Sequence, residues 1–140
     1  MQNKTLAPNI DTKEMEMLEE VVRVASPMDV EMIAEPLTKE TKEVYQLLYM
    51  NNQGEVMATQ LFYPHASDPS ILSFRDIFKS ALHLDAVSII VCHTHGANRT
   101  SPSMLDRGLS DQLAQAGKYI GVELLDSLFI SGNTFKSIKQ

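Results

Sequence analysis

The sequence predicts an α/β protein in which a mixed β-sheet is flanked by helices in three layers. Three observations lead to this prediction: helical and strand periodicities alternate along the chain, two adjacent segments have the pattern of a hairpin, and a buried-type strand lies between two helical segments. A hairpin pairs strands antiparallel, whereas a strand-helix-strand connection favours parallel pairing. The 140 residues, of which 44% are hydrophobic, are enough for one compact core.

The N-terminal part of the chain has apolar residues at helical spacing. The spacing over 14–25 predicts an amphipathic helix, and we therefore expect an N-terminal helical segment over 1–25. A main domain is expected over 26–140. It should begin with a second short helix that has Ser26 as its N-cap and Pro27 in its first turn.

A β-hairpin is predicted next. Between Glu43 and Met50, alternate residues would point to opposite faces of an extended chain, which is the periodicity of a strand. The polar stretch 51–54 contains a glycine and predicts a turn. Residues 56–62 would form the returning strand, so this pair is expected to be antiparallel.

Helices and strands alternate in the second half of the chain. A capped helix is expected to begin at Ser73, and the run 86–92 is almost entirely apolar, which is typical of a central strand covered on both faces. A further helix is expected over 103–118, with this buried stripe: Leu105, Leu109, Leu113 and Ala116. Closing strands are expected over 123–130 and 134–138.

The composition argues against several classes of protein. Lysine and arginine number 12 against 18 aspartates and glutamates, so the net charge is -6 and direct binding to nucleic acid is not expected. Cys92 is the only cysteine, and we expect it to be buried rather than reactive. The N-terminus lacks a secretory pattern and no apolar run is long enough to cross a membrane, so a cytoplasmic protein is expected.

Two histidines separated by one residue directly follow the predicted central strand. On an extended chain His93 and His95 would point to the same side, with Cα atoms about 6.6 Å apart. Zinc binds imidazole nitrogen and carboxylate oxygen, and a catalytic zinc has three protein ligands and a water. Asp106 is the candidate third ligand. The sequence therefore predicts one zinc ion (Zn2+) at the carboxyl end of a buried strand, where α/β sheets tend to place ligands.

A structural explanation exists for part of this pattern. Ser103 and Asp106 are spaced as in a capping box, in which both residues serve only to begin a helix. The two roles are compatible, because a carboxylate in the first helical turn is favoured by the helix dipole and can still direct one oxygen outward.

Five positions and their spacing resemble the JAMM motif of zinc metalloproteases, and more closely the JAB (MPN) domain of bacterial RadC-like proteins: Glu43, His93, His95, Ser103 and Asp106. The likeness extends from about residue 26 to the C-terminus and includes 73–82 and 116–126. The usual His-Asn-His-Pro-Ser-Gly of that family is replaced by His-Thr-His-Gly-Ala-Asn at 93–98, with the spacing to the later motif residues kept.

The resemblance implies a deaminase-like fold and a zinc metallopeptidase whose metal-activated water attacks a peptide or isopeptide carbonyl of a peptide or protein substrate. It assigns Glu43 as the general base and Ser103 as a hydrogen-bond donor to the developing oxyanion. Glu40, in the same charged run, is the alternative base. The resemblance also implies a catalytic domain alone, without the helix-hairpin-helix segment of full-length RadC proteins.

Two other functions are compatible with the sequence. One is a non-catalytic interaction module with the JAB fold, against which the intact set of five motif residues argues. The other is a DNA-repair-associated accessory protein, for which the acidic charge favours action through partners over direct contact with DNA.

Overall fold

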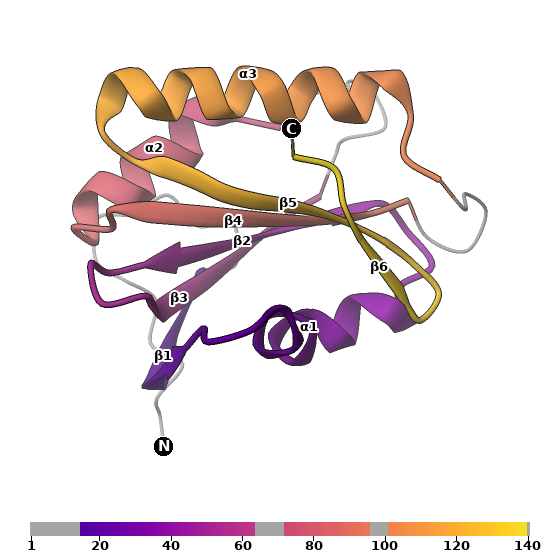
Figure 1. Ribbon diagram of the computed structural model, residues 1–140, viewed down its shortest axis with the longest axis horizontal. Coiled ribbons are helices and arrows are strands. Elements are labelled where there is room, and N and C mark those ends of the chain that lie inside the picture. Colours follow the sequence, from indigo (N-terminus) through magenta and orange to yellow (C-terminus); the bar gives the residue numbers. More distant parts are fainter. Residues whose placement is uncertain (1–14, 64–71, 96–100, 140) are drawn as a thin grey trace.

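A six-stranded β-sheet forms the centre of the protein in the computed structural model, which describes residues 15–63, 72–95 and 101–139 (Figure 1). The strands are β1 Met15–Arg23, β2 Val44–Met50, β3 Glu55–Phe62, β4 Ser88–Thr94, β5 Glu123–Ser131 and β6 Thr134–Ser137. The helices are α1 Pro27–Ala34, α2 Phe74–His83 and α3 Met104–Ile120, with a short 3-10 helix, η1, at Glu35–Lys39. The strands lie in the order β1-β3-β2-β4-β5-β6. Strands β4 and β5 pair in parallel and the other neighbours pair antiparallel, so the predicted mixed sheet is confirmed.

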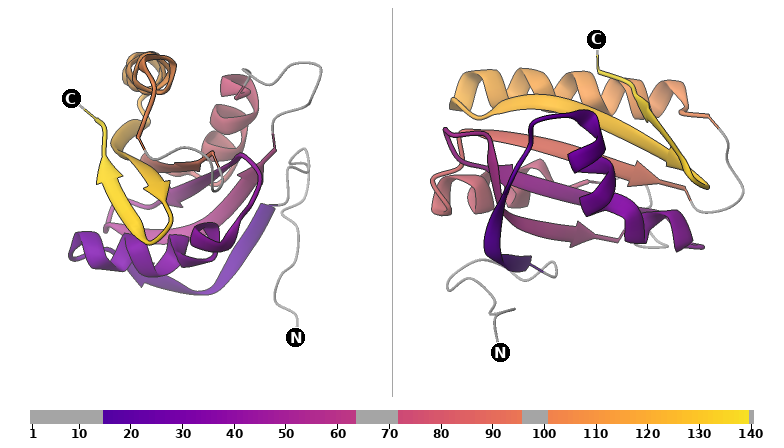
Figure 2. Two further views of the ribbon diagram at one scale, coloured as in Figure 1. Left: turned by 90° about the vertical axis from the view of Figure 1, so that its right-hand side faces the viewer. Right: turned by 60° about the horizontal axis from the view of Figure 1, so that its bottom comes forward.

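The sheet lies between two layers of helix (Figures 1 and 2). Helices α2 and α3 cover one face, and α1 with η1 covers the other. Strand β2 is buried along its whole length because its alternate side chains enter two different cores. One core includes Tyr45, Leu47, Tyr49, Ile77, Phe78 and Leu113. The other includes Val30, Ala34, Leu37, Val44, Leu48 and Met50. The predicted three-layer arrangement is therefore confirmed.

The helix predicted over 14–25 is wrong, because β1 occupies this part of the chain as an edge strand paired with β3. The pairing changes register between Met17 and Val22, which face residues only two positions apart on β3. This irregularity breaks the two-residue alternation of a regular strand, so that the apolar residues fall at spacings that imitate a helix. The domain boundary proposed at residue 26 stays a prediction, although β1 belongs to the same sheet as the strands that follow.

The buried stripe of α3 differs from the prediction only in part, because Leu113 is buried and Leu109 and Ala116 pack against the core as predicted. Leu105 is 70% exposed, and the buried positions are Asp106, Ser110, Leu113 and Gly117. The first turns of α3 therefore present polar side chains to the sheet, where the motif histidines lie. Near its other end α3 approaches the chain so closely that a Cβ atom on Gly117 would lie 2.1 Å from the carbonyl oxygen of Val122.

The remaining elements agree with the sequence analysis. Ser26 precedes α1, which has Pro27 in its first turn, and the β2–β3 and β5–β6 hairpins form as expected. The hydroxyl oxygen of Ser73 accepts a hydrogen bond from the backbone N–H of Asp76 (3.1 Å) at the start of α2. Strand β4 is central and fully buried. The polar stretches 63–70 and 96–101, for which the sequence predicts loops, lie largely outside the described residues. Within the described residues, no helix is long and apolar enough to cross a membrane.

Candidate metal centre

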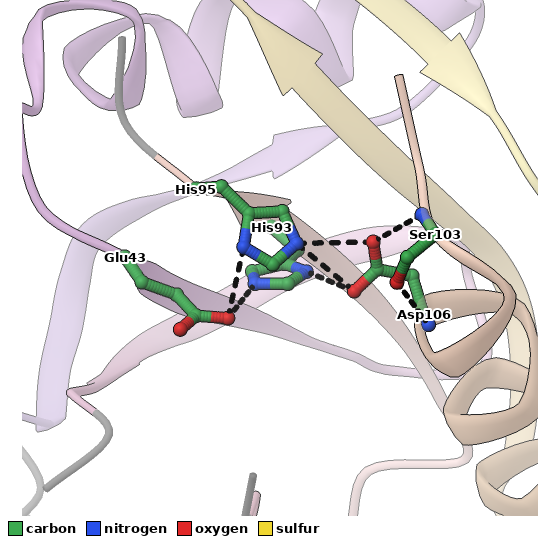
Figure 3. Close-up of polar contacts among 5 residues, drawn as sticks. All are labelled: Glu43, His93, His95, Ser103 and Asp106. Atoms are coloured by element: carbon green, nitrogen blue, oxygen red, sulfur yellow. Dashed lines mark hydrogen bonds and ion pairs between the residues drawn. The ribbon is translucent and has the colours of Figure 1, made fainter. Parts of the chain in front are cut away.

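The register of the central strands brings the motif residues together at one end of the sheet. Strand β2 begins where the antiparallel strand β4 ends, since Val44 is paired with Thr94. Glu43, immediately before β2, therefore lies beside His93 and His95 at the end of β4. Helix α3 begins over the same end of the sheet and supplies the remaining polar groups (Figure 3).

Both imidazoles lie between two carboxylates (Figure 3). On one side, Oε2 of Glu43 is 2.8 Å from Nε2 of His93 and 3.2 Å from Nδ1 of His95. On the other side, Oδ1 of Asp106 is 3.4 Å from Nδ1 of His93, and its Oδ2 is 3.0 Å from Nε2 of His95. Each imidazole therefore directs one nitrogen to each carboxylate.

The site is buried on one side and open on the other. The side chains of His93 and Asp106 are only 6% and 5% exposed, whereas those of His95 and Glu43 are 18% and 26% exposed. A molecule that enters the site from solvent therefore meets Glu43 and His95 first.

Ser103 and Asp106 form the capping box that their spacing predicts. The hydroxyl oxygen of Ser103 accepts a hydrogen bond from the backbone N–H of Asp106 (3.0 Å), and Oδ2 of Asp106 accepts one from the backbone N–H of Ser103 (2.7 Å). The same carboxylate contacts the imidazoles. Asp106 thus combines helix capping with contact to the histidines, two roles that the sequence pattern allows together.

Two aromatic residues that the sequence analysis did not assign to the site also belong to it. The ring of Tyr45 stacks on His93, with ring centroids 3.8 Å apart and planes 9° apart. Phe129 approaches His95 at 5.6 Å between ring centroids. The strand alternation contained a signal for Tyr45, because it lies two residues after Glu43 and therefore on the same face. Phe129 is on a distant strand, and its place depends on the pairing of β4 with β5.

The charged groups of the site stabilise one another. The hydrogen bond from His93 lowers the pKa of Glu43 despite the partial burial of this carboxyl group. Burial acts against ionisation of Asp106, but hydrogen bonds from His93 and the Ser103 backbone hold its pKa well below the ordinary value. Burial likewise disfavours a charged His93, yet hydrogen bonds to the two carboxylates raise its pKa. Both carboxylates are therefore ionised at neutral pH.

The donor set fits a divalent transition metal. Glu43, His93 and His95 each offer one ligand atom, and these atoms lie within 4.8 Å of one another. This group contains Glu43 where the predicted ligand set has Asp106, which contacts the same imidazoles from the buried side. Imidazole nitrogens and carboxylate oxygens together are ligands that zinc accepts. The assignment of Asp106 as the third ligand stays a prediction.

Comparison with known proteins shows the family of the chain. Residues 24–140 match the family described as the RadC-like JAB domain. The chain belongs to this family. A UPF0758 protein of Halalkalibacterium halodurans is 36% identical over 118 residues, which cover 84% of this chain and 51% of that protein. A UPF0758 protein of Clostridium perfringens is 32% identical over 120 residues, covering 85% and 53%. The chain spans about half the length of these relatives, whose names give a family designation and no activity.

The geometry of this RadC-like JAB domain also bears on two alternatives raised by the sequence. Glu40 follows η1 as its C-cap, and its backbone N–H donates to the carbonyl oxygen of Leu37 (3.2 Å). Glu43 is the glutamate that contacts the histidines. Cys92 is fully buried in the core under α1, and burial raises the pKa of its thiol, so the expectation of a buried cysteine is confirmed.

Proposed function

We propose that this RadC-like JAB domain is a zinc-dependent hydrolase that cleaves a peptide or isopeptide bond in a peptide or protein substrate. The observation that carries the proposal is the meeting of two histidines and two ionised carboxylates at one end of the sheet, with a serine hydroxyl at the adjoining helix start (Figure 3). The intact donor set favours an enzyme over a non-catalytic interaction module with the same fold.

His93, His95 and Asp106 are the residues proposed to hold the zinc ion. When bound, zinc supplies a Lewis acid that polarises a carbonyl group and lowers the pKa of a coordinated water toward ~7. The capping box fixes the Asp106 carboxylate at the start of α3 through its hydrogen bond from Ser103. The burial of His93 and Asp106 keeps water away from one side of the site.

Glu43 is the proposed general base. Its carboxylate contacts a nitrogen of each imidazole, so it would lie close to an ion or a water bound at these two histidines. Its lowered pKa keeps it ionised and able to accept a proton at neutral pH. It is also the most exposed of the four groups, so a substrate that enters from solvent lies on its side. The proton that Glu43 takes from water can then be delivered to the leaving amine.

Ser103 is the proposed donor to the oxyanion. Its hydroxyl oxygen already accepts a hydrogen bond from the Asp106 backbone. A hydroxyl that accepts one hydrogen bond can still donate its own proton. Placed beside the carbonyl under attack, this proton would stabilise the negative charge that develops on oxygen.

A comparison of two glutamine variants tests the enzyme proposal. Zinc-loaded wild type is screened against a peptide and isopeptide library, and the substrate found is assayed with Glu43→Gln and Glu40→Gln at matched zinc content. Glu43→Gln keeps the size of the side chain but cannot accept the proton, so turnover should fall by roughly 100-fold to 10,000-fold with folding unchanged. Glu40→Gln should match wild type.

Two results would contradict this mechanism. Full activity in both variants would leave the reaction without a carboxylate base. Loss of activity in Glu40→Gln with full activity in Glu43→Gln would show that the base is Glu40 and not Glu43. A wild-type protein that binds zinc and cleaves no amide in the library would favour the interaction module.

A further inference from the structure

His93 occupies the middle of a row of three rings across neighbouring strands. Tyr45 on β2 is its partner in the antiparallel pairing, and Phe129 on β5 is its partner in the parallel pairing. All three side chains are buried. Since paired residues share a face of the sheet, strand pairing alone places His93 between two aromatic neighbours, independently of its contacts with the carboxylates.

The rings of Tyr45, Phe129 and His95 approach His93 in different ways. Tyr45 lies face to face with it at 3.8 Å between ring centroids, with planes 9° apart. Phe129 presents an edge at 6.3 Å, and the ring of His95 is tilted by 58°. The face contact with Tyr45 is therefore the one that defines the plane of the imidazole.

The plane of this ring matters because the site uses both of its nitrogens. The torsion that turns a histidine ring has broad, weakly defined minima, so the rotamer alone does not fix the ring plane. In the structure, Nε2 of His93 is 2.8 Å from Glu43 and its Nδ1 is 3.4 Å from Asp106, and rotation of the ring would break both contacts. A flat, buried neighbour restricts that rotation. The negative face of a tyrosine ring also favours an imidazole that carries positive charge.

We infer that Tyr45 is a positioning residue whose ring face holds the His93 imidazole in the plane required for metal binding. The inference rests on the proposed zinc site. Because the flat ring restricts rotation of the imidazole, the affinity for zinc should depend on an aromatic side chain at this position rather than on burial of an equal volume.

Four variants separate positioning from general stability. Tyr45→Phe keeps the ring, Tyr45→Leu removes it, and Tyr45→Met retains a long apolar side chain without a flat face. Tyr49→Leu is the matched control, because Tyr49 is buried on the same face of β2 and packs in the same core, four residues further from the site. Zinc affinity is measured by competition with a chelator, and folding by thermal unfolding of the zinc-free protein. The shift of the His93 ring protons is followed by NMR and assigned with His93→Gln.

Tyr45→Leu and Tyr45→Met should weaken zinc binding by roughly 10-fold to 100-fold, the usual cost of losing a neighbour that orients a ligand. Their His93 ring protons should lose the upfield shift that a stacked ring causes, and Tyr45→Phe should retain both the shift and the affinity. Tyr49→Leu should unfold at a lower temperature with unchanged affinity.

Wild-type affinity in either ringless variant, or an equal loss of affinity in Tyr49→Leu, would overturn the inference. If Tyr45→Leu does not fold, Tyr45→Met is the variant that tests the inference. If wild type binds no zinc, the proposed function fails, whereas the NMR shifts still decide whether Tyr45 orients His93. If the His93 ring protons are shifted upfield in wild type and remain so in Tyr45→Met, the positioning role is refuted whether or not zinc binds.

Discussion

One carboxylate, that of Asp106, takes part in two sets of contacts. Its Oδ2 accepts a hydrogen bond from the Ser103 backbone and lies 3.0 Å from Nε2 of His95. The geometry of the helix start and that of the metal site are therefore not independent. A change at Ser103 is expected to affect both stability and catalysis, and the two effects need separate controls.

Ser103→Ala should lower stability and turnover together. Loss of the capping hydroxyl costs about 1 kcal/mol of unfolding free energy. Loss of the proposed oxyanion donor should reduce turnover by roughly 100-fold to 1,000-fold. Ser73→Ala is the matched control, because Ser73 makes the same capping hydrogen bond at the start of α2. It should lose similar stability, measured by urea unfolding, and retain turnover. Equal turnover in the two variants would show that Ser103 acts only as a helix cap.

His93 gives the metal-free protein a characteristic pH dependence. Its pKa is raised in the folded protein, so its contribution to stability is complete below the unfolded value of roughly 6.5 and is lost as the pH rises through the folded value. The carboxylates act in the opposite sense at low pH, because their pKa values are lowered. With chelator present, the melting temperature should fall as the pH rises above about 6.5, and His93→Gln should flatten this fall.

Zinc binding should respond to pH in the opposite direction, because protons compete with the metal for the histidines. Zinc occupancy should therefore rise over the same range in which the metal-free protein loses stability. A melting temperature of the chelated protein that rises steadily from pH 6 to 9 would contradict the ion pairs of His93.

Helix α3 illustrates how position decides the effect of one substitution. A Cβ on Gly108 would meet nothing within 4 Å, whereas on Gly117 it would lie 2.1 Å from the carbonyl oxygen of Val122. Gly108→Ala should therefore raise the free energy of unfolding by about 0.5–1 kcal/mol through helix propensity. Gly117→Ala should lower it by about 1–3 kcal/mol or more, because the helix must move away from the chain. Urea unfolding of both variants checks this, and equal stabilities would contradict the close approach.

The same helix shows why some elements were predictable and others were not. Strand β4 and the β2–β3 hairpin follow from local periodicity and turn residues, which the sequence contains in full. The stripe of α3 was wrong in the first turn, where Leu105 is exposed and Asp106 is buried instead, against His93 of β4. Strand β1 was misassigned because its pairing with β3 is irregular. Tyr45 and Phe129 reach the site through strand pairing, a property that no local pattern specifies.

The molecule as a whole places its reactive groups where three distant segments converge. Glu43 precedes β2, the histidines end β4, and Asp106 begins α3 (Figure 3). Spacing along the chain predicted His93, His95 and Asp106, whereas Glu43 and the role of Ser103 came from the resemblance to the JAMM motif. The net charge of -6 disfavours direct contact with nucleic acid, and a peptide or protein stays the proposed substrate.

Elemental analysis of the purified protein tests the zinc site itself. Wild type should contain close to one zinc per chain, and the His93→Ala, His95→Ala double variant should contain almost none, because two imidazoles are removed from the proposed ligands. Thermal unfolding of the double variant shows whether it is folded, and Glu40→Gln serves as a variant that should keep its zinc. Stoichiometric zinc in the folded double variant would place the metal elsewhere, and a wild type that takes up no zinc at neutral pH would contradict the zinc site altogether.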